Sequence, residues 1–200
     1  MQLIHNQIAN VIMRTVHTVS AALLATAFAA TASDIDWDYF EFEYIGVQFE
    51  DGADAKGVGA SVFYNPFGQI VLSGNFEYLS AEDIFDGGDI DLYSVSIGTG
   101  YYWPVQNNLH LVAEVIGNYS WDEFDDDEFG VAVGPGVRWG ATDRIELYTS
   151  AYYTYGEEFE GGVDVAAGTI IDLTDRLSFI TGYVYGDGDD GWYAGLQFPF

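Results

Sequence analysis

Hydrophobic and polar residues alternate along most of the chain, and the alternation is clearest in its last nine residues. Apolar side chains occupy every second position there, at Trp192, Ala194, Leu196, Phe198 and Phe200. Successive side chains of a β-strand point to opposite faces, so this segment predicts a strand with one apolar face. Such a strand is typical of a transmembrane β-barrel, in which lipid-facing and lumen-facing residues alternate.

Ten segments of the chain carry this alternation. They span residues 37–49, 57–64, 69–79, 90–102, 108–121, 129–139, 144–155, 162–171, 176–186 and 191–200. Lengths of about ten residues match a tilted strand that crosses a bilayer. The sequence therefore predicts an all-β, closed, up-and-down antiparallel barrel of ten strands. Glu41 and Glu43 disturb the apolar phase of the first segment, which leaves eight strands as the alternative.

The fifth and sixth segments have the most complete apolar faces. Val115 and Val133 lie in the middle of these faces, whereas Ala132 lies on the opposite face of its segment. We therefore expect the two valines near the bilayer midplane and Ala132 in the lumen.

Two kinds of connection alternate between the segments. The short kind comprises residues 65–68, 103–107, 140–143 and 172–175, and the longer, acidic kind comprises residues 50–56, 80–89, 122–128, 156–161 and 186–190. Bacterial barrels have short periplasmic turns and longer outer loops, so the acidic rim is expected to face outward. An even number of strands then places both ends of the mature chain on the periplasmic side.

Aromatic residues gather at both ends of the apolar band, as they do at the two membrane interfaces. The expected outer girdle contains Tyr78, Tyr119, Trp121, Tyr153, Tyr155, Tyr185 and Trp192, and the inner one contains Tyr101, Trp103, Trp139, Phe198 and Phe200. The alternative is a soluble β-sandwich or lipocalin-like barrel, which would bury its aromatics in a core rather than in two belts.

The N-terminus predicts a secretory signal. Residues 1–32 contain no Asp or Glu, one Arg (Arg14) and an apolar run that closes with Ala30-Thr31-Ala32. A basic start, a short apolar run and an Ala-x-Ala cleavage site indicate a cleaved signal peptide at 1–32, followed by a barrel at 33–200. A membrane anchor is the alternative, but the run is shorter than the roughly 20 residues of a spanning helix.

The composition excludes several function classes. The formal net charge of −27 opposes nucleic-acid binding, which requires Lys and Arg to neutralise phosphates. An apolar content of 49% and an aromatic content of 17% argue against disorder. The chain has no Cys, which removes disulfides and thiol chemistry.

With its signal peptide, its rhythm of strands and turns and its aromatic last strand, the chain resembles small Gram-negative outer-membrane β-barrel proteins of the OmpA transmembrane and OmpX type. The resemblance implies a place in the outer membrane, in contact with its lipid and lipopolysaccharide. It also implies that the last strand, through Trp192, Leu196, Phe198 and Phe200, carries the signal read by the barrel-assembly machinery. It does not indicate an oligomeric state.

Charged residues of the lumen are the first candidates for function. A hairpin turning at Asp125 and Asp126 would put Glu114 opposite Arg138, and the next hairpin would put Glu146 beside Arg138 on its other flank. We therefore expect a Glu114, Arg138 and Glu146 network across the interior.

Two roles follow for this network. A structural role in a largely filled lumen is favoured, because barrels of about eight strands are filled by side chains. This makes the protein a structural or surface-interaction barrel with acidic outer loops. The alternative is a narrow porin-like channel, which would prefer cations because the expected lumen also holds Glu41, Glu43, Glu77 and Asp164.

Metal and enzyme chemistry have weaker signals. Weak Ca²⁺ or Mg²⁺ sites are conceivable in two acidic clusters, Asp125, Asp126, Asp127 and Glu128, and Asp187, Asp189 and Asp190. Neither cluster forms a complete twelve-residue calcium loop, so solvated charge is favoured and no cofactor is expected. No catalysis is expected either. By resemblance, outer-membrane proteases use Asp and His at the outer rim. The one histidine after residue 32, His110, lies instead beside a predicted periplasmic turn.

Overall fold

The structure, a computed structural model, describes residues 35–49, 54–85, 88–124, 127–156, 161–186 and 189–200. The signal-peptide prediction lies outside these residues. The described chain forms ten strands, β1 (Tyr39–Phe49), β2 (Asp54–Tyr64), β3 (Ile70–Phe85), β4 (Gly88–Gln106), β5 (Leu109–Asp122), β6 (Asp127–Thr142), β7 (Ile145–Gly156), β8 (Gly162–Thr174), β9 (Leu177–Tyr185) and β10 (Asp189–Pro199). In this described part, no helix is both long and apolar enough to span a bilayer.

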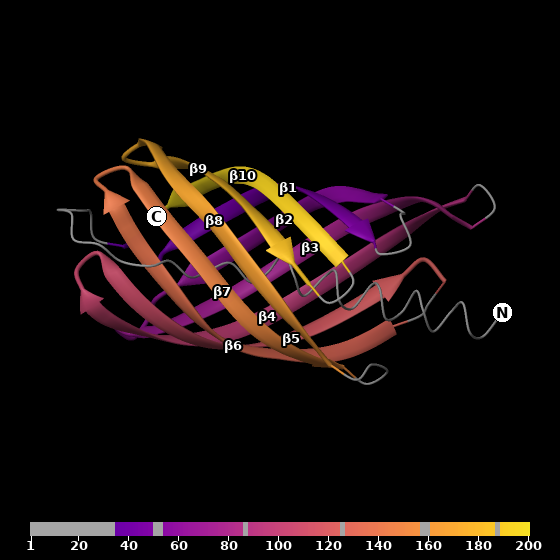
Figure 1. Cartoon of the computed structure of the whole chain (residues 1–200), viewed down its shortest axis with the longest axis horizontal. Helices are drawn as coiled ribbons and strands as arrows, with labels where there is room; N and C mark the ends of the chain where they lie inside the picture. Colours follow the sequence, from indigo (N-terminus) through magenta and orange to yellow (C-terminus); the bar gives the residue numbers. More distant parts are fainter. Residues whose placement is uncertain (1–34, 50–53, 86–87, 125–126, 157–160, 187–188) are drawn as a thin grey trace.

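Each strand pairs antiparallel with its sequence neighbours, and β1 pairs with β10, so the sheet closes into a barrel (Figure 1). The closed ten-stranded, up-and-down architecture confirms the fold prediction, and the eight-stranded alternative is wrong. Glu41 and Glu43 do not break β1, because both point into the lumen while Phe40, Phe42 and Tyr44 point outward.

The two faces of the wall have the predicted phase. Val115 and Val133 are 49% and 50% exposed on the outer face, and they stand directly opposite each other across β5 and β6. Ala132 is buried in the interior. Trp192, Leu196 and Phe198 of β10 also face outward, and Trp192 is 46% exposed. A face of this kind is stable only when lipid covers it.

Several strands run further than the alternation predicts. Most of the expected loop at residues 80–89 is strand, because β3 continues to Phe85 and β4 begins at Gly88. The expected turn at residues 103–107 likewise lies mostly within β4. The acidic connections are therefore short, since the backbone pairing continues after the apolar pattern has ended. In Figure 1 the β3–β4 hairpin extends furthest at its end of the barrel.

The predicted register between β5 and β6 is wrong. His110 rather than Glu114 stands opposite Arg138, and Glu114 stands opposite Gly134. Trp121 pairs with Asp127, which centres the hairpin on Phe124, whereas the prediction centred it on Asp125 and Asp126.

Candidate functional site

The N-terminal segment Ile35–Asp38 enters one mouth of the barrel. This mouth, here called the turn end, is where the β2–β3, β4–β5, β6–β7 and β8–β9 connections lie, and where β1 begins and β10 ends. Trp37 is only 2% exposed and stacks on Tyr102, with 5.2 Å between ring centroids. Its Nε1 donates a hydrogen bond of 3.1 Å to Nδ1 of His110. The segment therefore places a large aromatic ring inside the lumen.

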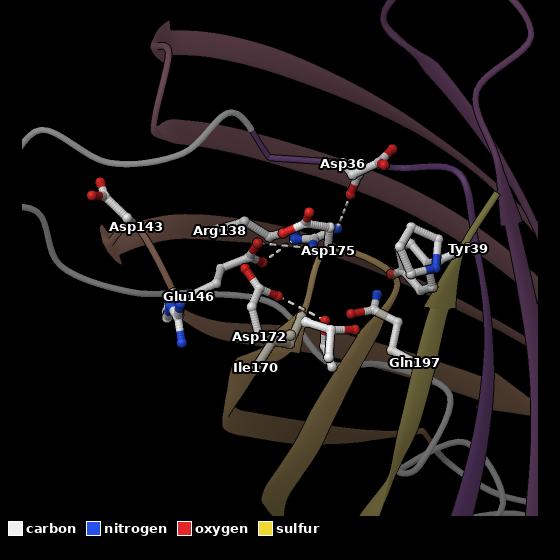
Figure 2. A pocket seen from close by; sticks show the side chains of 13 residues that line it. Asp36, Tyr39, Arg138, Asp143, Glu146, Ile170, Asp172, Asp175 and Gln197 are labelled. Atoms are coloured by element: carbon white, nitrogen blue, oxygen red, sulfur yellow. Dashed lines mark hydrogen bonds and ion pairs between the residues drawn. The ribbon is translucent and has the colours of Figure 1, made fainter.

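Arg138 ties this segment to the barrel wall. Its guanidinium carbon lies 4.5 Å from the centroid of the Trp37 ring, within the range of a cation–π interaction. Its Nη1 donates to the carbonyl oxygen of Asp36 at 3.0 Å. On the other side, its Nε and Nη2 both donate to the Glu146 carboxylate, the second at 2.9 Å (Figure 2). The guanidinium is thus held between the inserted segment and β7.

Backbone bonds fix the segment where it joins β1. The Asp38 carboxylate accepts a hydrogen bond of 2.6 Å from the backbone N–H of Asn65, and its carbonyl accepts one of 3.1 Å from the N–H of Phe200. The Asp36 carboxylate accepts the N–H of Asp38 at 3.0 Å. These bonds connect the segment to the β2–β3 turn and to the end of β10, so Trp37 is held from both sides of the mouth.

Tyrosines fill the lumen beyond this mouth. The hydroxyls of Tyr148 and Tyr193 lie 2.7 Å apart in a buried hydrogen bond. Each ring packs over a glycine directly opposite it on the next strand, Gly168 for Tyr148 and Gly182 for Tyr193. The missing side chains of these glycines leave room for the rings, so the interior is packed with side chains here.

Of the expected three-residue network, the structure brings Arg138 and Glu146 together and leaves Glu114 apart. The Glu114 carboxylate accepts a hydrogen bond from the Tyr152 hydroxyl. The other expected lumen acids, Glu41, Glu43, Glu77 and Asp164, are all buried. Glu43 and Glu77 both stand opposite Gly59, one on each side of β2. Among the buried described residues, carboxylates outnumber the single guanidinium.

In the half of the lumen further from the turn end, small polar side chains lie on β4 and β5, beside buried apolar side chains such as Leu79 and Ala81 on β3. Ser94, Asn118 and Ser120 are each at most 2% exposed, and their side chains form no hydrogen bond with the residues that the structure describes. Buried polar groups are almost always satisfied by protein or water. Water is therefore the expected partner of these three side chains, whereas the neighbouring interior of β1 to β3 is apolar.

The proposed metal clusters receive no support from the described residues. Asp125, Asp126 and Asp187 lie outside them, and the side chain of Asp189 does as well. Asp127 is exposed and Glu128 is buried, because neighbours in a strand point to opposite faces. Asp190 accepts a hydrogen bond from Tyr183 at 2.8 Å. Within the described ranges, no three His, Cys, Asp or Glu side chains are arranged to hold a metal ion.

The four residues of the expected assembly signal lie on the outer face, along the seam where β10 meets β1. Three aromatic pairs cross this seam: Phe200 with Phe40, Phe198 with Phe42, and Trp192 with Tyr44, at centroid distances of 4.7, 6.2 and 5.7 Å. The first-strand partners were not predicted, although their alternation with Glu41 and Glu43 is visible in the sequence. Trp37 and His110 were also missed as a pair, since 73 residues separate them.

Comparison with known proteins shows the fold. No family model and no curated protein matches the chain. Among solved structures, it is similar to the translocator domain of the autotransporter NalP from Neisseria meningitidis, with 10% identity, a TM-score of 0.55 and coverage of 100% of this chain and 97% of that one. The transport unit of the autotransporter AIDA-I from Escherichia coli gives 10% identity, a TM-score of 0.55 and coverage of 86% and 94%. An outer-membrane channel from Pseudomonas putida F1 gives 6% identity, a TM-score of 0.53 and coverage of 88% of this chain and 100% of that one. The chain thus has the fold of bacterial outer-membrane β-barrels.

Proposed function

We propose that this protein is an outer-membrane β-barrel of a Gram-negative bacterium, with its turn end in the periplasm. The continuous lipid-compatible face supports the membrane setting, and the fold shared with outer-membrane barrels supports the compartment. Three of the four connections at the turn end have only two residues, which supports the orientation because bacterial barrels have short periplasmic turns.

Its role is structural or surface-directed, with a lumen that is closed at rest. The observation that carries this proposal is Trp37, which is buried in the mouth between Tyr102, His110 and Arg138. Ions cross a narrow barrel only along a continuous polar path, and the buried indole of Trp37 interrupts such a path. The acidic outer rim would then be the part of the protein that meets ions or other molecules.

A narrow, cation-preferring channel is the second candidate. The buried acids Glu41, Glu43, Glu77 and Asp164 favour it, as do the buried polar side chains Ser94, Asn118 and Ser120. In this case displacement of the Trp37 segment would open the path, and the excess of carboxylates would select cations.

Single-channel recording in planar bilayers under a salt gradient separates the two. We expect the wild-type barrel to be silent and Trp37→Ala to give steps whose reversal potential has the sign of cation selectivity. Trp103→Ala is the matched control, because Trp103 is 48% exposed on the outer face, and it should remain silent. Stable conductance steps from the wild-type barrel would contradict the closed-barrel proposal and favour the channel. A folded but silent Trp37→Ala variant would show that Trp37 does not close the lumen.

A further inference from the structure

The hydrogen bond between Trp37 and His110 requires one protonation state of the histidine. An indole N–H can only donate, so Nδ1 of His110, at 3.1 Å from Nε1 of Trp37, is the acceptor and carries no proton. The proton of this neutral imidazole is therefore on Nε2. Histidine is the side chain whose charge ordinarily changes between about pH 5 and 8. One of the contacts that hold Trp37 in the mouth is thus sensitive to mild acid.

The surrounding rings hold His110 and Trp37 in this geometry. Both stack on Tyr102, His110 at a centroid distance of 4.8 Å and Trp37 at 5.2 Å, and the planes of His110 and Trp37 differ by only 8°. His110 is 6% exposed, and it is the one histidine in residues 35–200. Protonation of this ring therefore acts directly on the inserted segment.

Charges of both signs lie around His110. The ionisable groups that face this part of the mouth are Arg138 on β6, Asp36 and Asp38 on the inserted segment, Tyr39 and Glu41 on β1, Tyr102 on β4, Glu114 on β5 and Glu146 on β7. The carboxylates outnumber the guanidinium, which favours a proton on His110. Arg138, however, stands directly opposite His110, and like charges opposite each other in a sheet repel. The mouth as a whole thus favours an imidazolium, but the present position of the ring does not.

A proton on His110 changes two contacts of the inserted segment. It turns Nδ1 from an acceptor into a donor, so the Trp37 N–H loses its partner and faces another N–H. It also places a second positive charge opposite Arg138. Both changes weaken the insertion of Trp37, and by linkage the inserted Trp37 opposes the proton. Insertion is therefore complete at neutral pH and is lost as the pH falls through the range in which His110 gains its proton.

We propose that protonation of His110 releases Trp37 from the mouth, so that mild acid opens the turn end of the barrel. The proposal rests on the closed-barrel function and adds the regulation of that same closure. The bonds of Asp38 to Asn65 and Phe200 do not involve His110, so they keep the segment attached where it joins β1. Trp37 therefore leaves the mouth on a tethered segment and returns when the pH rises.

Indole N–H signals in NMR spectra test the release without requiring the lumen to conduct. The folded barrel in lipid nanodiscs is labelled with ¹⁵N-tryptophan, and Trp37→Phe identifies the signal of Trp37. Between about pH 7.5 and 5.5, we expect this signal to lose its hydrogen-bonded shift, whereas the signal of Trp103, on the outer face, stays in place. His110→Asn is the matched control, because its amide oxygen replaces Nδ1 as the acceptor and does not titrate. Its Trp37 signal should not respond to acid.

Single-channel recording at the same two pH values connects release with opening. We expect the open fraction of the wild-type barrel to rise about tenfold or more in acid, the factor that corresponds to the loss of one hydrogen bond. His110→Asn should stay closed at both pH values, and Trp37→Ala should be open at both. Heat-modifiability verifies that each variant is folded.

The outcomes separate the acid response from the closure itself. An unchanged Trp37 signal in acid would overturn the proposal, and so would an equal acid response in His110→Asn, because carboxylates would then be the groups that titrate. A wild type that is silent at both pH values beside a conducting Trp37→Ala would leave the closed barrel intact and overturn its acid opening. A wild type that conducts at neutral pH would contradict the closed barrel and, with it, the acid opening.

The wild-type barrel alone decides the matter if His110→Asn does not fold. The imidazole ¹⁵N signals of His110 report its protonation, and the indole signal reports the position of Trp37. The two should change with the same midpoint pH. A His110 that gains its proton while the Trp37 signal stays in place would overturn the proposal.

Discussion

Arg138 and Glu146 form a two-point ion pair although they are not opposite each other in the sheet. Arg138 stands opposite Tyr148, and Glu146 stands opposite Gly140, so the pair runs diagonally across β6 and β7. Diagonal neighbours lie within reach of long side chains. Gly140 leaves space beside Glu146, and the pairing becomes irregular between Gly140 and Thr142. The contact itself lies within the regular part of the pairing, so it depends on side-chain length.

The first prediction concerns this ion pair. Arg138→Met should destabilise the barrel, by less than the about 3 to 5 kcal/mol of a dry site, because the half-buried Glu146 carboxylate loses its counter-charge. Adding Glu146→Gln should recover part of that loss, since the uncompensated charge is then removed. The measurement is the free energy of unfolding in lipid vesicles, from denaturant titrations of the single and double variants.

Glu114→Gln is the matched control for this cycle. It also neutralises a buried acid, but Glu114 is bound by Tyr152 instead of Arg138. Arg138 acts on Glu114 only through space, so Glu114→Gln should recover less of the Arg138→Met loss than Glu146→Gln does. Equal recovery by both glutamine substitutions would mean that Arg138 responds to the total charge of the lumen and not to its contact with Glu146.

The same region shows what the sequence could and could not predict. The strands and their faces follow from alternation within each segment, so Val115, Val133 and Ala132 were placed correctly. Register depends on where each hairpin turns, and a small displacement of that centre put His110 opposite Arg138. The insertion of Trp37 depends on closure of the whole barrel, because the segment before β1 crosses the mouth to reach β4, β5 and β6, and no local pattern encodes it.

The second prediction tests the lipid face. Val133→Arg and Val115→Arg should each cost about 2 to 4 kcal/mol, the cost of a charge near the bilayer midplane. Val105→Arg is the depth control. Val105 is also exposed, but it lies beside the β4–β5 turn, and the same change should cost only about 0 to 1 kcal/mol there. Refolding equilibria in vesicles give the three values, and equal costs would contradict the assigned depth.

The third prediction concerns the seam between β1 and β10. Deletion of Phe200 should lower the amount of folded, heat-modifiable barrel in the outer membrane, because it removes the ring that packs on Phe40 and the terminus that bonds to Asp38. Phe40→Ala removes the same ring contact and leaves the C-terminus intact. If Phe200 acts only through its ring, the two variants will show the same deficit, whereas a larger deficit for the deletion shows that its backbone bond to Asp38 or a role of the last residue in assembly contributes as well.

The last prediction concerns the glycine beneath Tyr193. A Cβ atom at Gly182 would overlap the Tyr193 ring, so Gly182→Val should displace this ring and break its hydrogen bond to Tyr148. Overpacking of this kind costs about 1 to 3 kcal/mol. Gly74→Val is the control, because a Cβ there meets only Val62 at an ordinary contact distance of 3.5 Å. Truncation of the ring should make the valine tolerable, so the losses of Gly182→Val and Tyr193→Ala should be less than additive in the double variant. Denaturant unfolding in vesicles measures this coupling, and fully additive losses would show that Gly182 does not make room for the ring.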